Sequence, residues 1–400
     1  MAATSLPLQG VRILAVEQYG AGPWGSLYLA DLGAEVVKIE NLPEGGDVGR
    51  TVGPHFFAPG DSQFFQTFNR NKRSIAIDLK RPAGQAIFQA LVRTADGVFD
   101  NLRGDLPARL GLDYASLKAF KPAIVCAHLS AYGREGSRVN WPGYDYLMQA
   151  EVGYLSVTGE PDGPPARFGL SMVDLMTGLT TAFGLVAAIL GARTTGIGTD
   201  VDVSLFDTAL HNLNYPGTWY LNSGTVTGRE PRGAHPSLTP SQLYRTADGW
   251  LFVMCNKEKF WAPFVTLIGC PQWAAHPDYR DFTARLKHRD KLTRDLDAVL
   301  MMQTTAHWLA LLQGTIPVAP VHDIAQALER DFVHERGSVH QYDTAQGPDM
   351  RLLVNPIRLG GATLPHRHAP ALGADTDQLL TELGYDAAAI KALRAEGAIG

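Results

Sequence analysis

The first 130 residues alternate between short apolar runs and helical segments, and this alternation limits the possible folds more than any other feature of the chain. Residues Pro82 to Thr94 have the spacing of an amphipathic helix, and Trp24 to Leu32 form a second helix with Pro23 near its first position. Alternating strands and helices predict a parallel sheet covered by helices on both faces. Ligands of such sheets bind beyond the carboxyl ends of the strands. The expected strands are 11–16, 35–40, 74–79, 98–101, 124–130 and 198–205.

The chain has 400 residues, too many for one ordinary core, so we expect two domains or one large domain with an insertion. A helix is expected over 206–221, and the stretch after it, 223–240, is rich in Gly, Pro, Ser and Thr, as domain boundaries are. A hairpin follows over 243–254, turning at Ala247-Asp248-Gly249, and 316–321 is expected to return toward the first domain. The predicted domains are a large one over 1–222, a small one over 223–325 and a C-terminal part over 326–400.

Composition narrows the class of protein. Hydrophobic residues make up 45% and charged residues 19%, and the net charge of −5 argues against a nucleic-acid partner. Cys126, Cys255 and Cys270 lie in apolar surroundings, so we interpret them as reduced packing residues. The N-terminus lacks the pattern of a secretory signal, and the apolar run after Phe183 is shorter than the roughly 20 residues that span a bilayer. We therefore expect a cytoplasmic protein without membrane contact.

One carboxylate, Asp174, stands in apolar surroundings at the start of a helical segment, where an acid is expected to be paired, capping or functional. Ser171 and Asp174 have the spacing of a capping box, the commoner explanation. Alternatively, Asp174 is a nucleophile, ionised at neutral pH without a partner base, with Gly169 and Gly178 leaving room for a ligand or a close backbone approach. The following stretch, 182–190, is apolar on every side and is expected to be buried all round.

Other motifs carry less weight. Gly20 to Gly25 match the dinucleotide pattern G-x-G-x-x-G, but Pro23 removes an amide, and Trp24 is bulky where a backbone would approach its ligand. An oxidoreductase that binds a dinucleotide therefore stays a weaker alternative. The histidines have no matching cysteine or carboxylate spacing, so no metal site is predicted. The elbow motif of serine hydrolases is absent from the sequence.

Several motifs in order make the chain resemble the family III coenzyme A transferases, the group of formyl-CoA transferase and the CaiB/BaiF proteins. The resemblance covers nearly the whole length, and its motifs are specific only together. They are A-G-P and D-L-G-A-E-V-V-K-I-E within 10–40, N-R-N-K-R-S-I-A-I-D-L-K at 69–80, A-Y-G-R-E-G at 131, P-G-Y-D at 142, T-G-E-P-D-G-P-P at 158, G-L-S-M-V-D-L-M-T-G at 169 and D-V-S-L-F-D at 202.

The resemblance implies a Rossmann-like large domain built from both chain ends, a smaller α+β domain and an interlocked homodimer. It implies that Asp174 is the catalytic nucleophile, that CoA thioesters are substrates, and that no resident cofactor is needed. The implied coenzyme A contacts are Gln18, Tyr19, Ala21, Lys80, Asn101, Leu102, Arg109 and Tyr132. The implied reaction moves CoA between small carboxylic acids, dicarboxylic acids foremost, through an aspartyl anhydride and an aspartyl-CoA thioester.

Three departures from the formyl-CoA transferase pattern argue against a formyl or oxalate preference. Gly20 replaces a glutamine, Asn41 replaces an arginine, and a run of glycines has no counterpart near His235. We expect Tyr144 and His235 to contact the acceptor acid. The α-methylacyl-CoA racemases are the alternative within the same fold, but their G-H-D motif is Gly143-Tyr144-Asp145 here, and tyrosine is a poor substitute for the histidine base.

Overall fold

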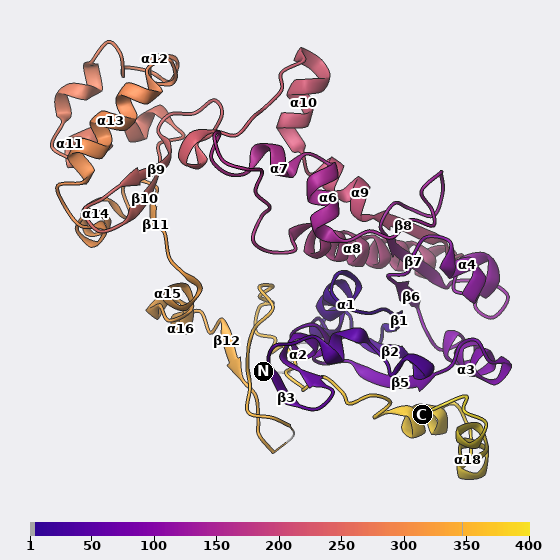
Figure 1. The fold of residues 1–400 in the computed structure, drawn as a ribbon. Coiled ribbons are helices and arrows are strands. Elements are labelled where there is room, and N and C mark those ends of the chain that lie inside the picture. The colour runs from indigo at the N-terminus through magenta and orange to yellow at the C-terminus, as the bar shows by residue number, and fades with distance from the viewer. Residues whose placement is uncertain (1–4, 346) are drawn as a thin grey trace. The chain divides into compact units, whose positions relative to one another are not determined.

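A six-stranded parallel sheet is the centre of the first of two units in the computed structural model, which describes residues 5–345 and 347–400 (Figure 1). Its spatial order, β5-β2-β1-β6-β7-β8, corresponds to 3-2-1-4-5-6 along the chain. This is the doubly wound order, whose direction reverses between β1 and β6. The sequence predicted all six strands to within two residues at each end. They are β1 (Arg12–Val16), β2 (Glu35–Asn41), β5 (Arg73–Ile77), β6 (Gly97–Asp100), β7 (Val125–Ser130) and β8 (Asp200–Ser204).

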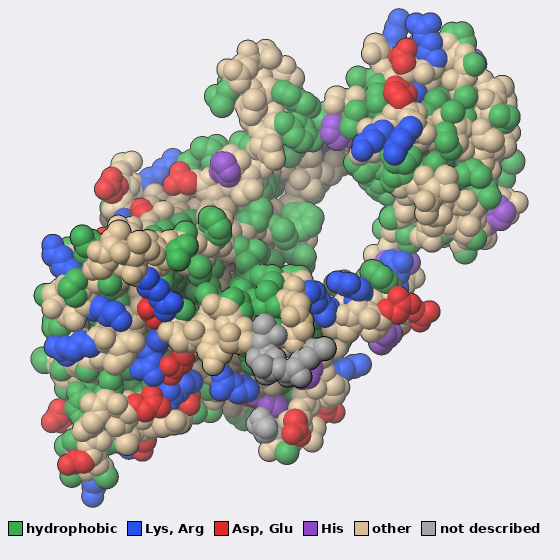
Figure 2. Space-filling view, turned by 180° about the vertical axis from the view of Figure 1, so that it is seen from behind, with side chains coloured by type: hydrophobic (Ala, Val, Ile, Leu, Met, Phe, Trp, Pro, Cys, Tyr) green, Lys and Arg blue, Asp and Glu red, His purple; other side chains and the backbone are tan. Residues whose placement is uncertain are grey.

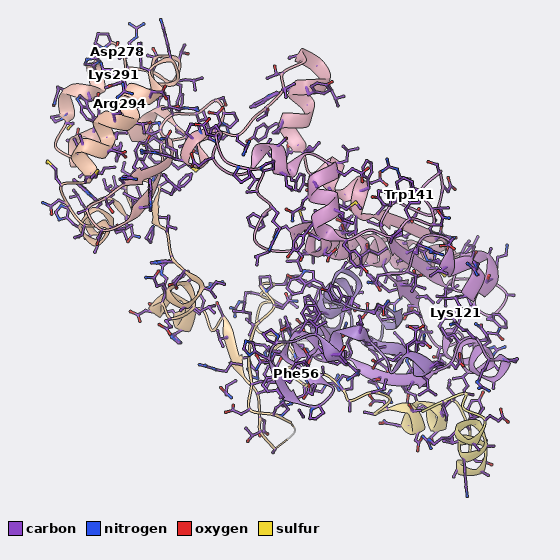
Figure 3. All side chains as sticks on the ribbon, in the orientation of Figure 1. Phe56, Lys121, Trp141, Asp278, Lys291 and Arg294 are labelled. Atoms are coloured by element: carbon purple, nitrogen blue, oxygen red, sulfur yellow. The ribbon has the colours of Figure 1, made fainter. Side chains whose placement is uncertain are left out.

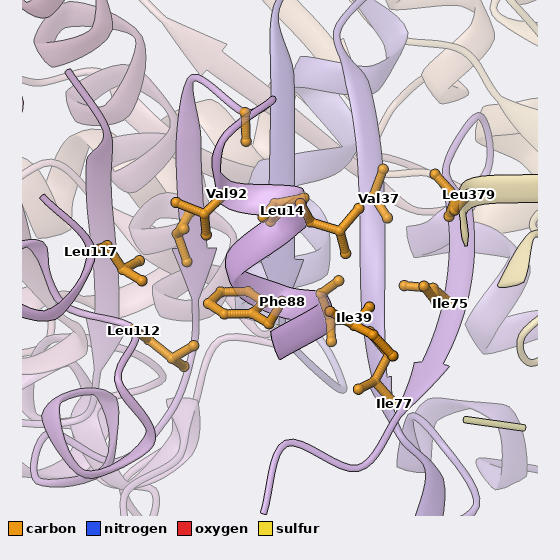
Figure 4. Packing of buried hydrophobic residues seen from close by; sticks show 14 of the residues in the cluster. Leu14, Val37, Ile39, Ile75, Ile77, Phe88, Val92, Leu112, Leu117 and Leu379 are labelled. Carbon is orange, nitrogen blue, oxygen red and sulfur yellow. The ribbon is translucent and has the colours of Figure 1, made fainter. Parts of the chain in front are cut away.

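Neighbouring residues of each strand face opposite sides of the sheet, and each side is covered by helices. Leu14 faces α3 (Pro82–Val92) in a core that also holds Phe88 (Figure 4). Ile13 faces the other layer, which contains α1 (Ala21–Asp31) and α8 (Met172–Thr195). Because these side chains are fully buried, each stabilises the fold by about 1.5–3 kcal/mol.

The C-terminal part of the chain completes the core of this unit. Helices α17 (Thr376–Glu382) and α18 (Ala387–Ala395) bring Leu379, Leu380 and Ile390 into the cluster around α3. Ile399 pairs with Ile77 at the end of β5. The large unit is therefore built from both ends of the chain.

The second unit has its own sheet and core. An antiparallel sheet of order β11-β10-β9 consists of β9 (Ser241–Arg245), β10 (Trp250–Met254) and β11 (Val318–Pro320), as the predicted hairpin requires. The expectation that 316–321 returns to the first domain is wrong, because this segment pairs with β10. The core of the unit is made by α11 (Trp261–Leu267), α13 (Arg289–Leu300) and α14 (Thr305–Leu312).

The boundaries of the units differ from the predicted ones. The second unit consists of Gly153–Gly169 and Leu213–Phe332, and the described remainder belongs to the first. The segment 153–169 joins the second unit through distant partners that composition does not reveal: Arg229 donates to the carbonyl of Gly163, and Glu160 accepts from the amide of Arg232.

Two helices also differ from their predicted extents. The expected helix 206–221 is divided into α9 (Leu205–His211) and α10 (Asn214–Ser223), and Asn214 has a positive φ of 53°. Helix α1 begins at Ala21 rather than at Trp24. The remaining helices and strands are α2 (Gln63–Asn69), α4 (Leu106–Leu110), α5 (Tyr114–Leu117), α6 (Asp145–Glu151), α7 (Tyr154–Val157), α12 (Phe282–Lys287), α15 (Ile324–Leu328), α16 (Asp331–Glu335), β3 (Phe56–Ala58), β4 (Asp61–Ser62), β12 (Val339–Gln341) and β13 (Arg351–Leu353).

Helix α8 is only partly covered, which corrects the expectation that its apolar half is buried all round. Leu185 and Ile189 face the sheet, but Phe183 and Leu190 are 77% and 70% exposed. In the described part of the chain, α8 is the one helix long and apolar enough to cross a membrane. Its packing against α1 and β7 makes it a layer of the large unit.

Charges of both signs are mixed over the face of the molecule shown in Figure 2. Many of them are paired. Arg73, for example, contacts both Glu35 and Glu382, and Lys291 contacts Asp278 in the second unit (Figure 3). Cys126, Cys255 and Cys270 are free and buried, as predicted.

Candidate active site

The site begins with the turn that follows β1, because buried side chains hold its backbone. Gln18 donates its amide to Asn101 Oδ1 (2.8 Å), and Asn101 Nδ2 donates to the Gln18 carbonyl (2.8 Å). Tyr19 has a positive φ of 69° and donates its amide to Asp47 Oδ1 (2.9 Å). Lys38 Nζ lies 2.8 Å from Asp47 Oδ2 and donates to the Glu17 carbonyl (2.9 Å). The turn is therefore held by the half-buried Asn101 on one side and by the buried Lys38 and Asp47 on the other.

Two lysines are buried in this cluster with their acids. Burial opposes the charge of Lys38, but Asp47 and Glu17 outweigh it and raise its pKa. Burial also lowers the pKa of Lys72 to about 8, although Lys72 Nζ donates to Glu17 Oε1 at 2.8 Å. Because the charges compensate one another in a desolvated cluster, removal of one member leaves an unpaired buried charge.

A contact between two glycines brings the start of α1 against the start of α8. A Cβ on Gly25 would lie 2.4 Å from the Gly178 carbonyl oxygen, and a Cβ on Gly178 would lie 2.3 Å from the Ala21 carbonyl oxygen. Only glycine at both positions allows the helix backbones to touch. The sequence analysis gave a close backbone approach as one possible role for Gly178, and α1 and α8 make this approach at Gly178. Gly169 has no such neighbour within 4 Å.

Asp174 occupies the first turn of α8, and its surroundings favour the protonated form. Its amide donates to Asp145 Oδ2 (2.9 Å), and Asp145 Oδ1 accepts from Gln149 Nε2 (2.6 Å). Burial, and then the negative charge of Asp145, raise the pKa of Asp174 to about 7. The carboxylate is thus only partly ionised near neutral pH, whereas an ordinary aspartate would be fully ionised.

The predicted capping box is absent from the described part of α8. Ser171 makes no side-chain capping bond, and Asp145 satisfies the amide of Asp174 from helix α6 instead. The side chain of Asp174 is therefore left available for chemistry.

A cavity of about 220 Å³ opens in front of Asp174 at the carboxyl ends of β1 and β6. This is the position where the strand order reverses and where doubly wound sheets bind their ligands. The start of α1 faces this cavity, and the amides of Gly20 and Ala21 have no protein acceptor among the described residues. The predicted site residues that line it are Gln18, Tyr19, Ala21, Asn101, Leu102, Tyr144 and Asp174.

A second cavity, of about 120 Å³, lies next to the first at the strand ends. Lys80 and Ile39 line it, and Gln18 and Leu102 line both cavities. Lys80 therefore lines one of two neighbouring cavities at this edge of the sheet, and Asp174 lines the other.

Three predicted residues lie outside these cavities. Arg109 is exposed and paired with Asp105 (3.2 Å). Tyr132 packs edge-on against Trp141, which does line the cavity of Asp174 and lies between β7 and α6 (Figure 3). His235 belongs to the second unit, where its ring accepts or donates a hydrogen bond with Tyr215 (3.2 Å).

A buried polar cluster beneath the sheet edge was not predicted. His128 Nδ1 lies 2.6 Å from Asp100 Oδ2, and His128 Nε2 lies 3.0 Å from Asp200 Oδ1. Burial opposes protonation of His128, but these two carboxylates outweigh it and raise its pKa to about 9. Asp100 also accepts from the amide of Leu102, so the cluster holds the loop that carries Asn101 and Leu102.

The family model described as CoA-transferase family III matches residues 8–376. A succinate–glutarate CoA-transferase of Agrobacterium fabrum is 32% identical, over 94% of this chain and 96% of that protein. An acetyl-CoA:oxalate CoA-transferase of Acetobacter aceti is also 32% identical, over 91% and 92%. A solved CaiB/BaiF family structure from Brucella suis superposes with a TM-score of 0.82 at 30% identity, covering 95% of this chain and all of that one.

The chain therefore belongs to CoA-transferase family III, as its motifs indicated. It is a CoA-transferase, and enzymes of this kind act on an acyl-CoA and a carboxylate.

Proposed function

We propose that this enzyme moves CoA between small carboxylic acids, dicarboxylic acids among them, through covalent intermediates on Asp174. The observation that carries the proposal is the position of Asp174: a half-buried carboxylate, free of capping bonds, that faces a cavity at the switch point of the sheet. A carboxylate with a raised pKa is also more basic, which makes it a better nucleophile toward a thioester.

Each step of the reaction balances without an external acid or base. An Asp174 oxygen attacks the thioester carbon, the C–S bond breaks, and an aspartyl anhydride and CoA thiolate form. The thiolate attacks the aspartyl carbonyl, which gives aspartyl-CoA and releases the donor acid as its carboxylate. The acceptor carboxylate then attacks aspartyl-CoA and expels the thiolate. The thiolate attacks the acceptor acyl carbon of the new anhydride and restores Asp174.

The two neighbouring cavities, which share Gln18 and Leu102 in their walls, support a position for CoA along the strand ends. Lys80 at one end offers a positive charge for phosphate groups, and the thioester would lie at Asp174 at the other. The free amides at the start of α1 are suited to the negative charge that develops on the attacked carbonyl oxygen. The relatives named for succinate, glutarate and oxalate support small acids as the exchanged groups.

Oxygen transfer tests the pathway directly. We would incubate the enzyme with succinyl-CoA and ¹⁸O-labelled glutarate, chosen as probes, and follow both the product thioester and the Asp174 peptide by mass spectrometry. Because the acceptor leaves one oxygen on Asp174, this peptide should gain heavy oxygen as glutaryl-CoA forms. Glutaryl-CoA formation with an unlabelled Asp174 would rule out the pathway. Exchange of an α-proton without any new thioester would support the racemase alternative.

An Asp145→Asn variant should shift the pH dependence of transfer. The neutral amide oxygen can still accept from the Asp174 amide, but the like charge is gone, so the pKa of Asp174 should fall toward that of an ordinary aspartate. The acidic limb of kcat/KM against pH should move from about 7 to lower pH by roughly one unit. Glu396→Gln, which removes an exposed acid, should leave the limb in place. An unmoved limb in Asp145→Asn would show that Asp145 does not act on Asp174.

Self-association is the second part of the proposal. Leu179, Phe183, Ala187 and Leu190 are exposed on one face of α8 at spacings of three and four residues. A contiguous apolar stripe of this kind marks an interaction surface, and in this position on the large unit a second copy of the chain would cover it symmetrically.

A double variant, Phe183→Glu with Leu190→Glu, should therefore lower the mass in solution. Light scattering after size exclusion should give twice the 43.3 kDa of the chain for the wild type and the single-chain mass for the variant. Met302→Glu, at a residue that is 70% exposed in the second unit, serves as the control and should stay dimeric. A wild type that elutes as a monomer would refute this part.

A further inference from the structure

Position 20 stands out because its backbone does not require glycine. Gly20 has φ −119° and ψ −67°, a right-handed conformation whose negative φ does not require glycine. A Cβ built there meets one atom within 4 Å, Asp174 Oδ2 at 3.5 Å. Neither strain nor a crowded neighbour explains the absence of a side chain. What the glycine leaves open is the space beside the oxygen of the nucleophile.

This space cannot be changed by a small shift of the turn. The three residues before Gly20 are held on both sides, by Asn101 at Gln18, by Asp47 at Tyr19 and by Lys38 at Glu17. Lys38 and Asp47 are almost fully buried, and their charges are paired. After Gly20, α1 is held against α8 by the contact of Gly25 with Gly178. A side chain at position 20 would therefore have to project into the cavity.

We propose that Gly20 is a specificity-determining residue, and that its missing side chain leaves room for the chain of the acid beyond the reacting carboxyl group. The inference rests on the proposed function, because it places the acyl carbon on an oxygen of Asp174. Once that bond forms, the next carbons of the acyl group lie within van der Waals distance of position 20. The open space thus admits acids of four and five carbons, and any larger residue would restrict the enzyme to shorter ones.

Isotope exchange measures each acid separately. Labelled acetate, propionate, succinate and glutarate are each incubated with their own CoA thioester, and incorporation of label into the thioester is followed. Gly20→Leu should lower the ratio of glutarate to acetate exchange by about tenfold or more, since one displaced methylene group changes discrimination by about 10- to 200-fold. Gly20→Ala should show the same trend with a smaller change.

Gly360→Leu is the matched control, because Gly360 is exposed, has no neighbour within 4 Å and lies outside both cavities. It should keep the wild-type profile. The inference is overturned if Gly20→Leu keeps the wild-type ratio or loses exchange equally for all four acids. Gly20→Ala provides the same comparison if the leucine variant does not fold.

Failure of this inference differs from failure of the proposed function. If Asp174 is not the nucleophile, the wild type forms product without heavy oxygen on Asp174. If only the role of Gly20 is wrong, the wild type labels Asp174 and the variants keep its preference among the acids.

Discussion

Asp174→Asn should lose CoA transfer by about a thousandfold or more, because an amide cannot form the anhydride. Binding of CoA should be retained, since the amide of residue 174 still donates to Asp145 and the cavity keeps its walls. Initial rates of thioester formation and binding of free CoA by calorimetry measure the two effects separately. An asparagine variant that transfers CoA at the wild-type rate would show that Asp174 has a structural role only.

The same variant should be more stable than the wild type above neutral pH. Folding raises the pKa of Asp174 to about 7, so the folded chain holds this proton more tightly than the unfolded chain. The free energy of unfolding therefore falls as the pH rises from about 4 to about 7. Asparagine does not titrate, so the variant does not lose this stability. The loss in the wild type is on the order of 1–3 kcal/mol, because solvent partly screens a half-buried group. Urea unfolding should show the full gain at pH 8, about a third of it at pH 5 and almost none at pH 3.

Gly178→Ala should destabilise the large unit and reduce transfer together. The added methyl group would lie 2.3 Å from the Ala21 carbonyl oxygen, far inside contact distance, so α1 and α8 must separate. Overpacking of this kind costs about 1–3 kcal/mol, and the separation moves Asp174 away from the start of α1. Thermal unfolding and kcat should both fall.

Gly191→Ala is the matched control in the same helix. Gly191 is exposed and has no neighbour within 4 Å, so alanine there should stabilise the helix by about 0.5–1 kcal/mol and leave kcat unchanged. Opposite changes in melting temperature for the two variants would establish that the glycine contact, and not helix propensity, governs position 178. A neutral Gly178→Ala would contradict the contact.

Local patterns in the sequence were sufficient to predict most of the strands and helices of the large unit. The apolar runs of β1, β2 and β7 fit between helices whose spacing is equally clear, and connection rules then leave few possible sheets. The hairpin of β9 and β10 followed from its Asp248-Gly249 turn. The resemblance, together with an acid in apolar surroundings, led to Asp174.

The electrostatics of the site depend on contacts between distant residues, and these were not predictable. Asp145 is 29 residues from Asp174, and nothing in the local pattern shows that it caps α8 and raises the pKa of the nucleophile. The same holds for Asp47 beneath Tyr19. The third strand of this sheet, β11, was also not predicted. A strand of three residues is too short to show a recognisable alternation of apolar and polar residues.

The return of the C-terminal helices to the sheet has a consequence for synthesis. Leu379, Leu380 and Ile399 fill the core beside β5, although β5 itself ends at Ile77. During translation this apolar surface of the large unit therefore stays exposed until α17 and α18 have left the ribosome. The second unit ends at residue 332, so it can fold earlier. Chaperones should therefore bind mainly to the large unit. Chains that stall or are truncated before α17 should aggregate through the exposed surface beside β5.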